Sequence, residues 1–154
     1  MNVSARPAAF WIIVIFLAYY LVFLLAGQTA SLFAYDFTVR MGLQESAKVV
    51  GEYGVQVNRA LGLADTVVLI PLIIISLIGL FLRKTWALTT LAAVMGITLY
   101  WPICCSGLLF FLEGVTGFSL EPGMGYWLVF AVHTGFALWT LFCIVLRGQT
   151  LFGR

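Results

Sequence analysis

The chain has 154 residues, of which 63% are hydrophobic and 9% are charged. Ordinary soluble domains are about 45–50% apolar and about 25% charged, so this composition excludes a soluble fold and a separate soluble catalytic domain. The net charge of +2 is small and the basic residues are scattered, which excludes nucleic acid as a partner. We therefore expect an integral membrane protein whose main partner is the lipid bilayer.

Four apolar runs predict four transmembrane helices, because about 20 apolar residues are enough to cross a hydrocarbon core of about 30 Å. The predicted spans are residues 8–35, 66–82, 85–112 and 126–146. At about 1.5 Å per residue the first run is longer than the core is thick, so it should tilt or emerge from the bilayer. The predicted fold class is an all-α integral membrane protein, folded as a single four-transmembrane-helix bundle.

The segment 36–65 separates the first two spans and holds most of the charge of the chain. Apolar residues recur in it at roughly helical spacing, which is typical of amphipathic helices that lie on a membrane surface. We expect a long amphipathic loop with one or two such helices, and a plain connecting loop is the alternative. Asp65 is expected to cap the first turn of the second span.

The charges divide by side if the four spans alternate in direction. One side carries only basic residues: Arg6, Arg83, Lys84, Arg147 and Arg154. The other side carries all six carboxylates: Asp36, Glu45, Glu52, Asp65, Glu113 and Glu121. Because cytoplasmic loops are enriched in lysine and arginine, this division predicts cytoplasmic N- and C-termini and an extracytoplasmic 36–65 loop. The membrane is expected to be a plasma membrane or a bacterial inner membrane.

Several polar residues should share one depth, roughly 10–12 Å below the outer surface when counted at 1.5 Å per residue. They are Gln28, Thr29, Cys104, Cys105, Ser106, His133 and Thr134. Polar side chains in hydrocarbon are costly without partners, so this layer should face inward and bond to itself. We expect it to bind a lipid or a small molecule.

His133 is the single histidine of the chain and is expected well inside the fourth span. An ionisable residue inside a membrane favours a functional site. The alternative is that neutral His133 only bridges neighbouring helices, for example to Gln28 or Thr29.

Cys104 and Cys105 are adjacent, and two neighbouring thiolates with His133 opposite would suit a soft metal ion. The cysteine pair resembles that of the small bacterial mercury-uptake proteins in these two residues alone, since neither the flanking residues nor a second cysteine pair is present. The alternative is that free cysteines pack as small apolar side chains, with only one of them facing the core. The sequence does not identify a cofactor.

Asp36 and Glu113 end the first and third spans at a similar level. Two such rim acids could bind a cation or act as acid and base if their helix ends were neighbours. Solvated helix termini are the alternative interpretation.

The chain contains no HExxH, GxSxG or CxxC motif, so the sequence favours a protein that is not an enzyme. The leading hypothesis is a ligand- or lipid-binding protein or an accessory subunit of a membrane complex. A transporter or channel component acting as a homo-oligomer comes second, because polar residues in spans often mark pathways. A lipid-modifying enzyme that works through His133 with Cys104, or through the rim acids, comes third.

Overall fold

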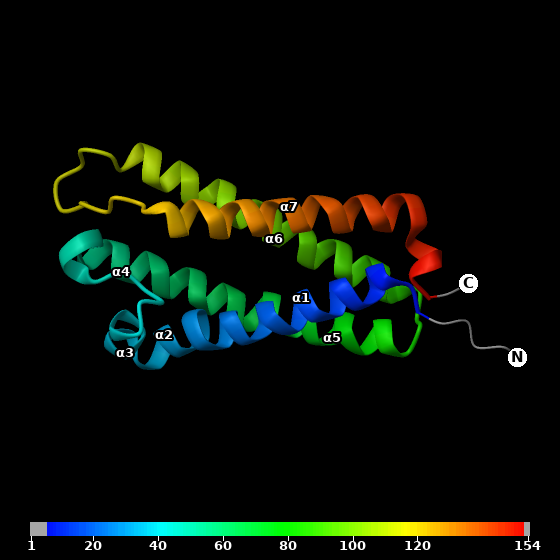
Figure 1. Ribbon diagram of the computed structural model, residues 1–154. Coiled ribbons are helices and arrows are strands. Elements are labelled where there is room, and N and C mark those ends of the chain that lie inside the picture. The colour runs from blue at the N-terminus through cyan, green and yellow to red at the C-terminus, as the bar shows by residue number, and fades with distance from the viewer. Residues whose placement is uncertain (1–5, 153–154) are drawn as a thin grey trace, which may run out of the picture.

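The computed structural model describes residues 6–152, and these form an all-helical bundle without strands in that range (Figure 1). Four helices are long and apolar enough to cross a membrane: Ala8–Phe33, Ala47–Phe81, Trp86–Phe111 and Met124–Arg147. The predictions of an all-α fold and of four potential transmembrane helices are confirmed.

The first long helix consists of α1 (Ala8–Leu24), a π-helical segment (Leu25–Thr29, the first π segment) and α2 (Ala30–Phe33). It ends at Ala34, whose φ of −144° and ψ of 61° lie outside the helical region. A short helix, α3 (Tyr35–Arg40), and a turn then lead to the second long helix. The predicted long loop is therefore reduced to α3 and this turn.

The second long helix differs from the sequence prediction because it begins at Ala47 instead of near residue 66. It runs through α4 (Ala47–Ala64), a second π segment (Asp65–Leu69) and α5 (Ile70–Phe81). Gly51 has a φ of 70°, a backbone conformation that glycine adopts readily because it has no Cβ. This residue kinks α4 near its start. The expectation that Asp65 caps a helix start is wrong, because Asp65 has helical backbone angles within the continuous helix.

Polar side chains near the end of α4 bond to the first long helix and to α3. Asn58 donates a hydrogen bond to the Tyr35 hydroxyl at 3.1 Å, and Arg59 donates one to the Leu32 carbonyl at 3.2 Å. Gly62, which has no side chain, allows α4 to approach the backbone of the first long helix closely, since a Cβ there would lie 2.8 Å from the carbonyl oxygen of Gln28. Two polar residues of α4 thus bond to neighbouring helices, whereas Lys48, Glu52 and Gln56 of the same helix are exposed.

The two remaining long helices are α6 (Trp86–Phe111) and α7 (Met124–Arg147), and a 3₁₀ segment follows (Gly148–Phe152). α6 packs against both α5 and α7, and α1 packs against α5. The centre of the bundle is filled by fully buried apolar side chains: Phe10, Ile13, Leu17, Ile73, Leu91 and Met95.

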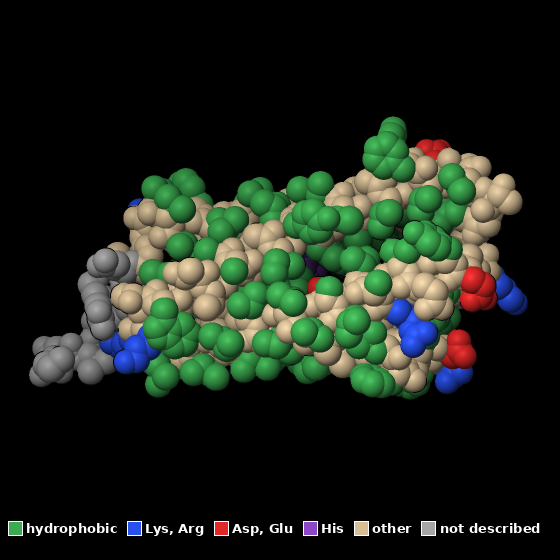
Figure 2. Space-filling model, turned by 180° about the vertical axis from the view of Figure 1, so that it is seen from behind, with side chains coloured by type: hydrophobic (Ala, Val, Ile, Leu, Met, Phe, Trp, Pro, Cys, Tyr) green, Lys and Arg blue, Asp and Glu red, His purple; other side chains and the backbone are tan. Residues whose placement is uncertain are grey.

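The start of α1, the α5–α6 turn and the 3₁₀ segment lie at one end of the bundle, and α3 and the α6–α7 connection lie at the other (Figure 1). Arg6 ties the first end together by donating a hydrogen bond to the Phe81 carbonyl at 2.9 Å and lying 4.5 Å from the centre of the Phe10 ring. We call this end the basic end. Acidic side chains gather at the opposite end, which we call the acidic end (Figure 2).

Candidate functional site

The middle of the bundle holds a buried polar cluster, which we define as Tyr20, Asp65, Thr98, Cys105 and His133. Tyr20 joins its members: it is 3% exposed, its ring centre lies 5.1 Å from that of His133, and its hydroxyl reaches the Thr98 side chain. The same hydroxyl lies within electrostatic range of Asp65 and Cys105. All four long helices therefore contribute to one polar site.

His133 is 1% exposed, and its ring has one hydrogen-bond acceptor without a partner, Nε2. Its Nδ1 lies 2.8 Å from the carbonyl oxygen of Val129, one turn earlier in α7. A carbonyl only accepts, so in the neutral ring Nδ1 carries the proton and Nε2 keeps a lone pair. Nε2 is buried without a hydrogen-bond partner. Such an orphaned atom calls for an explanation, because leaving it unpaired costs about 1–3 kcal/mol.

Five aromatic rings surround the imidazole. Their centres lie between 5.1 Å and 6.3 Å from that of His133, and they belong to Phe16, Tyr19, Tyr20, Phe23 and Trp101. Four of these rings come from α1, so the first long helix supplies most of the wall around the histidine. The imidazole is fixed in position by this packing.

Asp65 is the one buried carboxylate among the described residues, and 8% of its surface remains exposed. Within residues 6–152 it makes no hydrogen bond and no ion pair, although Tyr20 and Cys105 lie in electrostatic range. Figure 2 shows a hollow in the middle of this face, with histidine atoms and acidic atoms visible at its bottom. A carboxylate without a partner at this depth is unusual, since buried charges are normally paired.

The two π segments contact each other beside this cluster. Thr29 and Thr66, one from each segment, share a hydrogen bond of 2.9 Å between their hydroxyls. Gln28 Oε1 is buried there without a partner. π segments often occur at functional sites because they change the direction in which side chains and carbonyls point. Here the two π segments adjoin the cluster, and the second one contains Asp65.

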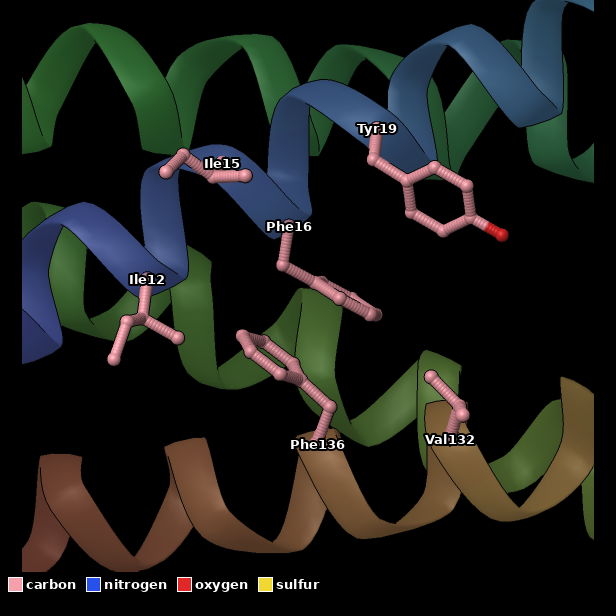
Figure 3. Close-up of a pocket in the computed structure, with 6 residues that line it drawn as sticks. All are labelled: Ile12, Ile15, Phe16, Tyr19, Val132 and Phe136. Atoms are coloured by element: carbon pink, nitrogen blue, oxygen red, sulfur yellow. The ribbon is translucent and has the colours of Figure 1, made fainter. Parts of the chain in front are cut away.

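An apolar groove of about 390 Å³ runs between α1 and α7 (Figure 3). Its lining residues are Ile12, Ile15, Phe16, Tyr19, Val132 and Phe136. Phe16 and Phe136 stack across it with ring centres 3.6 Å apart. Phe16 and Tyr19 also touch His133, so the polar cluster lies directly behind the wall of the groove.

The structure separates the two adjacent cysteines. Cys105 faces the cluster, within electrostatic range of Asp65, whereas Cys104 contacts the outward-facing Tyr100. Among the described residues no group of three or more His, Cys, Asp or Glu side chains is arranged to hold a metal ion. Ser106 and Thr134 are partly exposed and make no side-chain hydrogen bond in the described range. Of the predicted polar layer, Cys105 and His133 belong to the cluster around Tyr20, whereas Gln28 and Thr29 lie in the first π segment, which contacts the π segment that carries Asp65.

The rim acids Asp36 and Glu113 are both exposed and do not meet. Figure 1 places α3, which carries Asp36, on the opposite side of the acidic end from the last turn of α6. Asp36 instead lines a smaller pocket of about 200 Å³ between α3 and α4, together with Glu52 and Arg59. The two carboxylates therefore cannot act as one acid–base pair.

The acidic end is closed by hydrogen bonds around Glu45. Tyr126 of α7 donates to the Glu45 carboxylate, and Tyr35 donates to the Glu45 carbonyl at 2.9 Å. Burial raises the pKa of Tyr35, so its hydroxyl stays protonated and able to donate. The α6–α7 connection adds a bond from the Ser119 N–H to the Val49 carbonyl at 2.8 Å.

Comparison of the chain with models of protein families, with curated proteins and with solved structures finds no match.

Sequence reasoning missed Tyr20 and Asp65 as site residues. The predicted second span, residues 66–82, begins after the charged segment, and this places Asp65 at the outer surface. Apolar residues continue at helical spacing on both sides of Asp65. This pattern is compatible with one helix over residues 47–81 and could have identified Asp65 as a residue inside the helix. Tyr20 carries no such signal, because a tyrosine in an apolar run is most simply a packing residue.

Proposed function

We propose that this chain is an integral membrane protein that crosses a plasma membrane or a bacterial inner membrane four times, with both termini in the cytoplasm. The distribution of charge supports this topology. Arg6, Arg83, Lys84 and Arg147 lie at the basic end, which would face the cytoplasm under the positive-inside rule. The carboxylates other than Asp65 gather at the acidic end, which would face outward.

We propose further that the polar cluster binds an amphipathic, lipid-like ligand. The observation that carries the proposal is the free Nε2 of His133, fixed by the Nδ1 contact with Val129 and buried behind the groove. A buried acceptor that no protein donor satisfies is explained if a bound molecule supplies the donor. Asp65, also without a hydrogen bond, offers a second contact for the same polar head.

The groove between α1 and α7 fits the apolar part of such a ligand. Ligand sites are mostly apolar, with a few polar groups that fix orientation, and this groove and the cluster together have that character. The ligand head would reach His133 after Phe16 and Tyr19 change rotamer, since these two side chains separate the groove from the imidazole. A molecule dissolved in the bilayer could enter sideways without crossing water.

The test is the analysis of lipids that remain bound after the protein is extracted with its surrounding bilayer and then exchanged into mild detergent. We expect one amphipathic molecule per chain to survive the exchange in the wild type and in Leu138→Ala, an exposed position on α7. His133→Phe should lose it, because the acceptor is removed while a ring of similar size stays. A folded wild type that carries no molecule, or a His133→Phe variant that retains it, would overturn the proposal.

Transport is the second candidate function, and Asp65 favours it. An ionisable side chain in the interior of a membrane bundle often lies on the path of an ion or a proton. If the protein conducts, vesicles that contain it should dissipate an imposed ion gradient, and Asp65→Asn should abolish the flux. Gradients that decay at the rate of protein-free vesicles would exclude this candidate.

A role as a homo-oligomer or as a subunit of a larger membrane complex is supported by the small residues on the outer face of α7. Ala131 and Gly135 are exposed, and a Cβ at Gly135 would meet nothing within 4 Å. Small residues at this spacing let two helices approach closely within a membrane.

A further inference from the structure

We infer that the polar head recognised by the cluster is a protonated amine, so that the ligand is a long-chain amine held by Asp65 and His133. This inference rests on the ligand-binding function proposed above and names the class of ligand. It follows from the kind of polar atoms left unpaired, from the charge of Asp65 and from the rings around the site.

The unpaired atoms of the site are acceptors. Within the cluster, His133 Nε2 is buried without a partner and the Asp65 carboxylate makes no hydrogen bond in residues 6–152; in the adjoining π segment, Gln28 Oε1 is also buried without a partner. The other two buried polar atoms without partners, on Arg6 and Thr140, belong to positions nearer the basic end. A ligand that satisfies the site must therefore donate hydrogen bonds, and a primary ammonium group has three donors.

The charge of Asp65 separates an ammonium group from a hydroxyl group. Among residues 6–152, the titratable side chains in electrostatic range of this carboxylate are Tyr20 from α1 and Cys105 from α6, and neither is a cation. Removing a carboxylate from water costs several kcal/mol unless an opposite charge accompanies it. A neutral alcohol could donate one hydrogen bond but would leave this charge uncompensated. An ammonium group would supply both the donors and the charge.

The aromatic wall is also suited to a cation. The rings of Phe16, Tyr19, Tyr20, Phe23 and Trp101 lie around His133. The faces of such rings attract ammonium groups, and the attraction strengthens when water is excluded. The apolar groove of about 390 Å³ next to this wall matches a hydrocarbon chain. A long-chain amine has both parts, whereas a small water-soluble amine has only the first.

The experiment compares three probes on the full-length protein in nanodiscs of phosphatidylcholine: tetradecylamine, tetradecanol and butylamine. Bound probe is measured by native mass spectrometry. Tetradecylamine and tetradecanol share a chain and differ in the head, and butylamine tests whether a free small amine is enough. We expect tetradecylamine to bind at least tenfold more tightly than either of the others.

Two variants locate the effect. Asp65→Asn should reduce the affinity for tetradecylamine to that for tetradecanol, whereas Asp36→Asn, which changes an exposed carboxylate, should leave it unchanged. Because the amine and the alcohol are compared first on the wild type, the inference stays testable even if Asp65→Asn does not fold.

Three other results of the probe comparison would contradict the inference, each in a different way. Equal binding of tetradecylamine and tetradecanol would contradict the inference but would leave the proposed lipid-binding function intact. Butylamine binding as tightly as tetradecylamine would assign the site to free amines and overturn the long-chain class. Failure of all three probes would overturn the inference alone if the purified protein still retains its own lipid-like molecule, and would overturn both proposals if it does not.

Discussion

His133 Nε2 is buried without a partner, and the largely buried Asp65 makes no hydrogen bond within residues 6–152, which lowers the stability of the protein without a ligand. An orphaned acceptor costs about 1–3 kcal/mol, and an unpaired buried charge costs more. Side chains chosen for packing alone would avoid both costs. The presence of Asp65 and His133 on helices next to Tyr20 therefore supports the proposed binding function.

The first prediction concerns the stability of Asp65→Asn. The amide has almost the same shape as the carboxylate and bears no charge, so we expect the variant without ligand to gain about 1 kcal/mol or more in unfolding free energy at neutral pH. Thermal unfolding in a fixed detergent measures it. Asp36→Asn is the control and should change stability by less than about 0.5 kcal/mol, because that side chain is exposed. A clear loss of stability in Asp65→Asn would show that the carboxylate has a stabilising partner.

The sequence predicted part of the site at this scale. Counting about 1.5 Å per residue gives Gln28, Thr29, Cys105 and His133 one depth. In the structure Cys105 and His133 lie in the cluster, and Gln28 and Thr29 lie in the π segment that adjoins it. Counting along separate helices gives depth but not rotation about the helix axis, so it could not distinguish Cys105 from Cys104 or exclude Ser106 and Thr134. It also could not identify Tyr20, whose role depends on three neighbouring helices.

Among the helices, the contact between the first and second long helices positions the site. The two π segments adjoin each other, and Gly62 allows the backbones to approach closely enough for Thr29 to reach Thr66. Asp65 is the first residue of the second π segment, Asp65–Leu69, and is buried there. Separating these two helices should therefore disturb the polar cluster.

The second prediction tests this contact with Gly62→Ala. The added Cβ would lie 2.8 Å from the Gln28 carbonyl oxygen, which is backbone and cannot move aside alone. We expect a loss of about 1–3 kcal/mol in unfolding free energy, as for other overpacked positions.

The matched control is Gly96→Ala on α6, where a Cβ would meet nothing within 4 Å. Alanine favours helix over glycine by about 0.5–1 kcal/mol, so this variant should be as stable as the wild type or more so. The same thermal unfolding assay measures both variants. Equal effects at the two positions would contradict the close approach of the two helices.

The amphipathic pattern of residues 47–64 shows why the second helix was predicted to be too short. Hydrophobic periodicity reports that one face is apolar and another polar, but not what the polar face meets. A membrane surface and a polar stretch of a neighbouring helix produce the same pattern. Arg59 and Asn58 find partners on the first long helix and α3, which sequence periodicity alone could not reveal.

Across the whole molecule, the basic and acidic ends predict its orientation in the membrane. A cysteine in place of Glu121, in the α6–α7 connection, should react with a membrane-impermeant maleimide on intact cells. A cysteine in place of Lys84, in the α5–α6 turn, should react only after the cells are opened, and the native chain should stay unlabelled because its three cysteines lie within long helices. The opposite pattern of labelling would reverse the topology.

Composition and apolar run length predicted the all-helical fold and its four long helices, because burying a backbone in lipid leaves few alternatives to helices. The α1/α7 groove was not predictable in the same way. It arises because α1 packs against α5 while α7 packs against α6, and pairing between helices depends on side-chain shape at many positions.

The measurement that tests the central claim most directly is ¹⁵N NMR of the histidine ring, because the chain has a single histidine. The protein would be labelled with ¹⁵N-histidine, purified without a histidine tag, and recorded with its native lipids and again after delipidation. We predict that Nδ1 is protonated in the delipidated protein while Nε2 is not, and that the Nε2 resonance moves when native lipids are present. A proton on Nε2 after delipidation, or an Nε2 resonance that is the same in both preparations, would contradict the account.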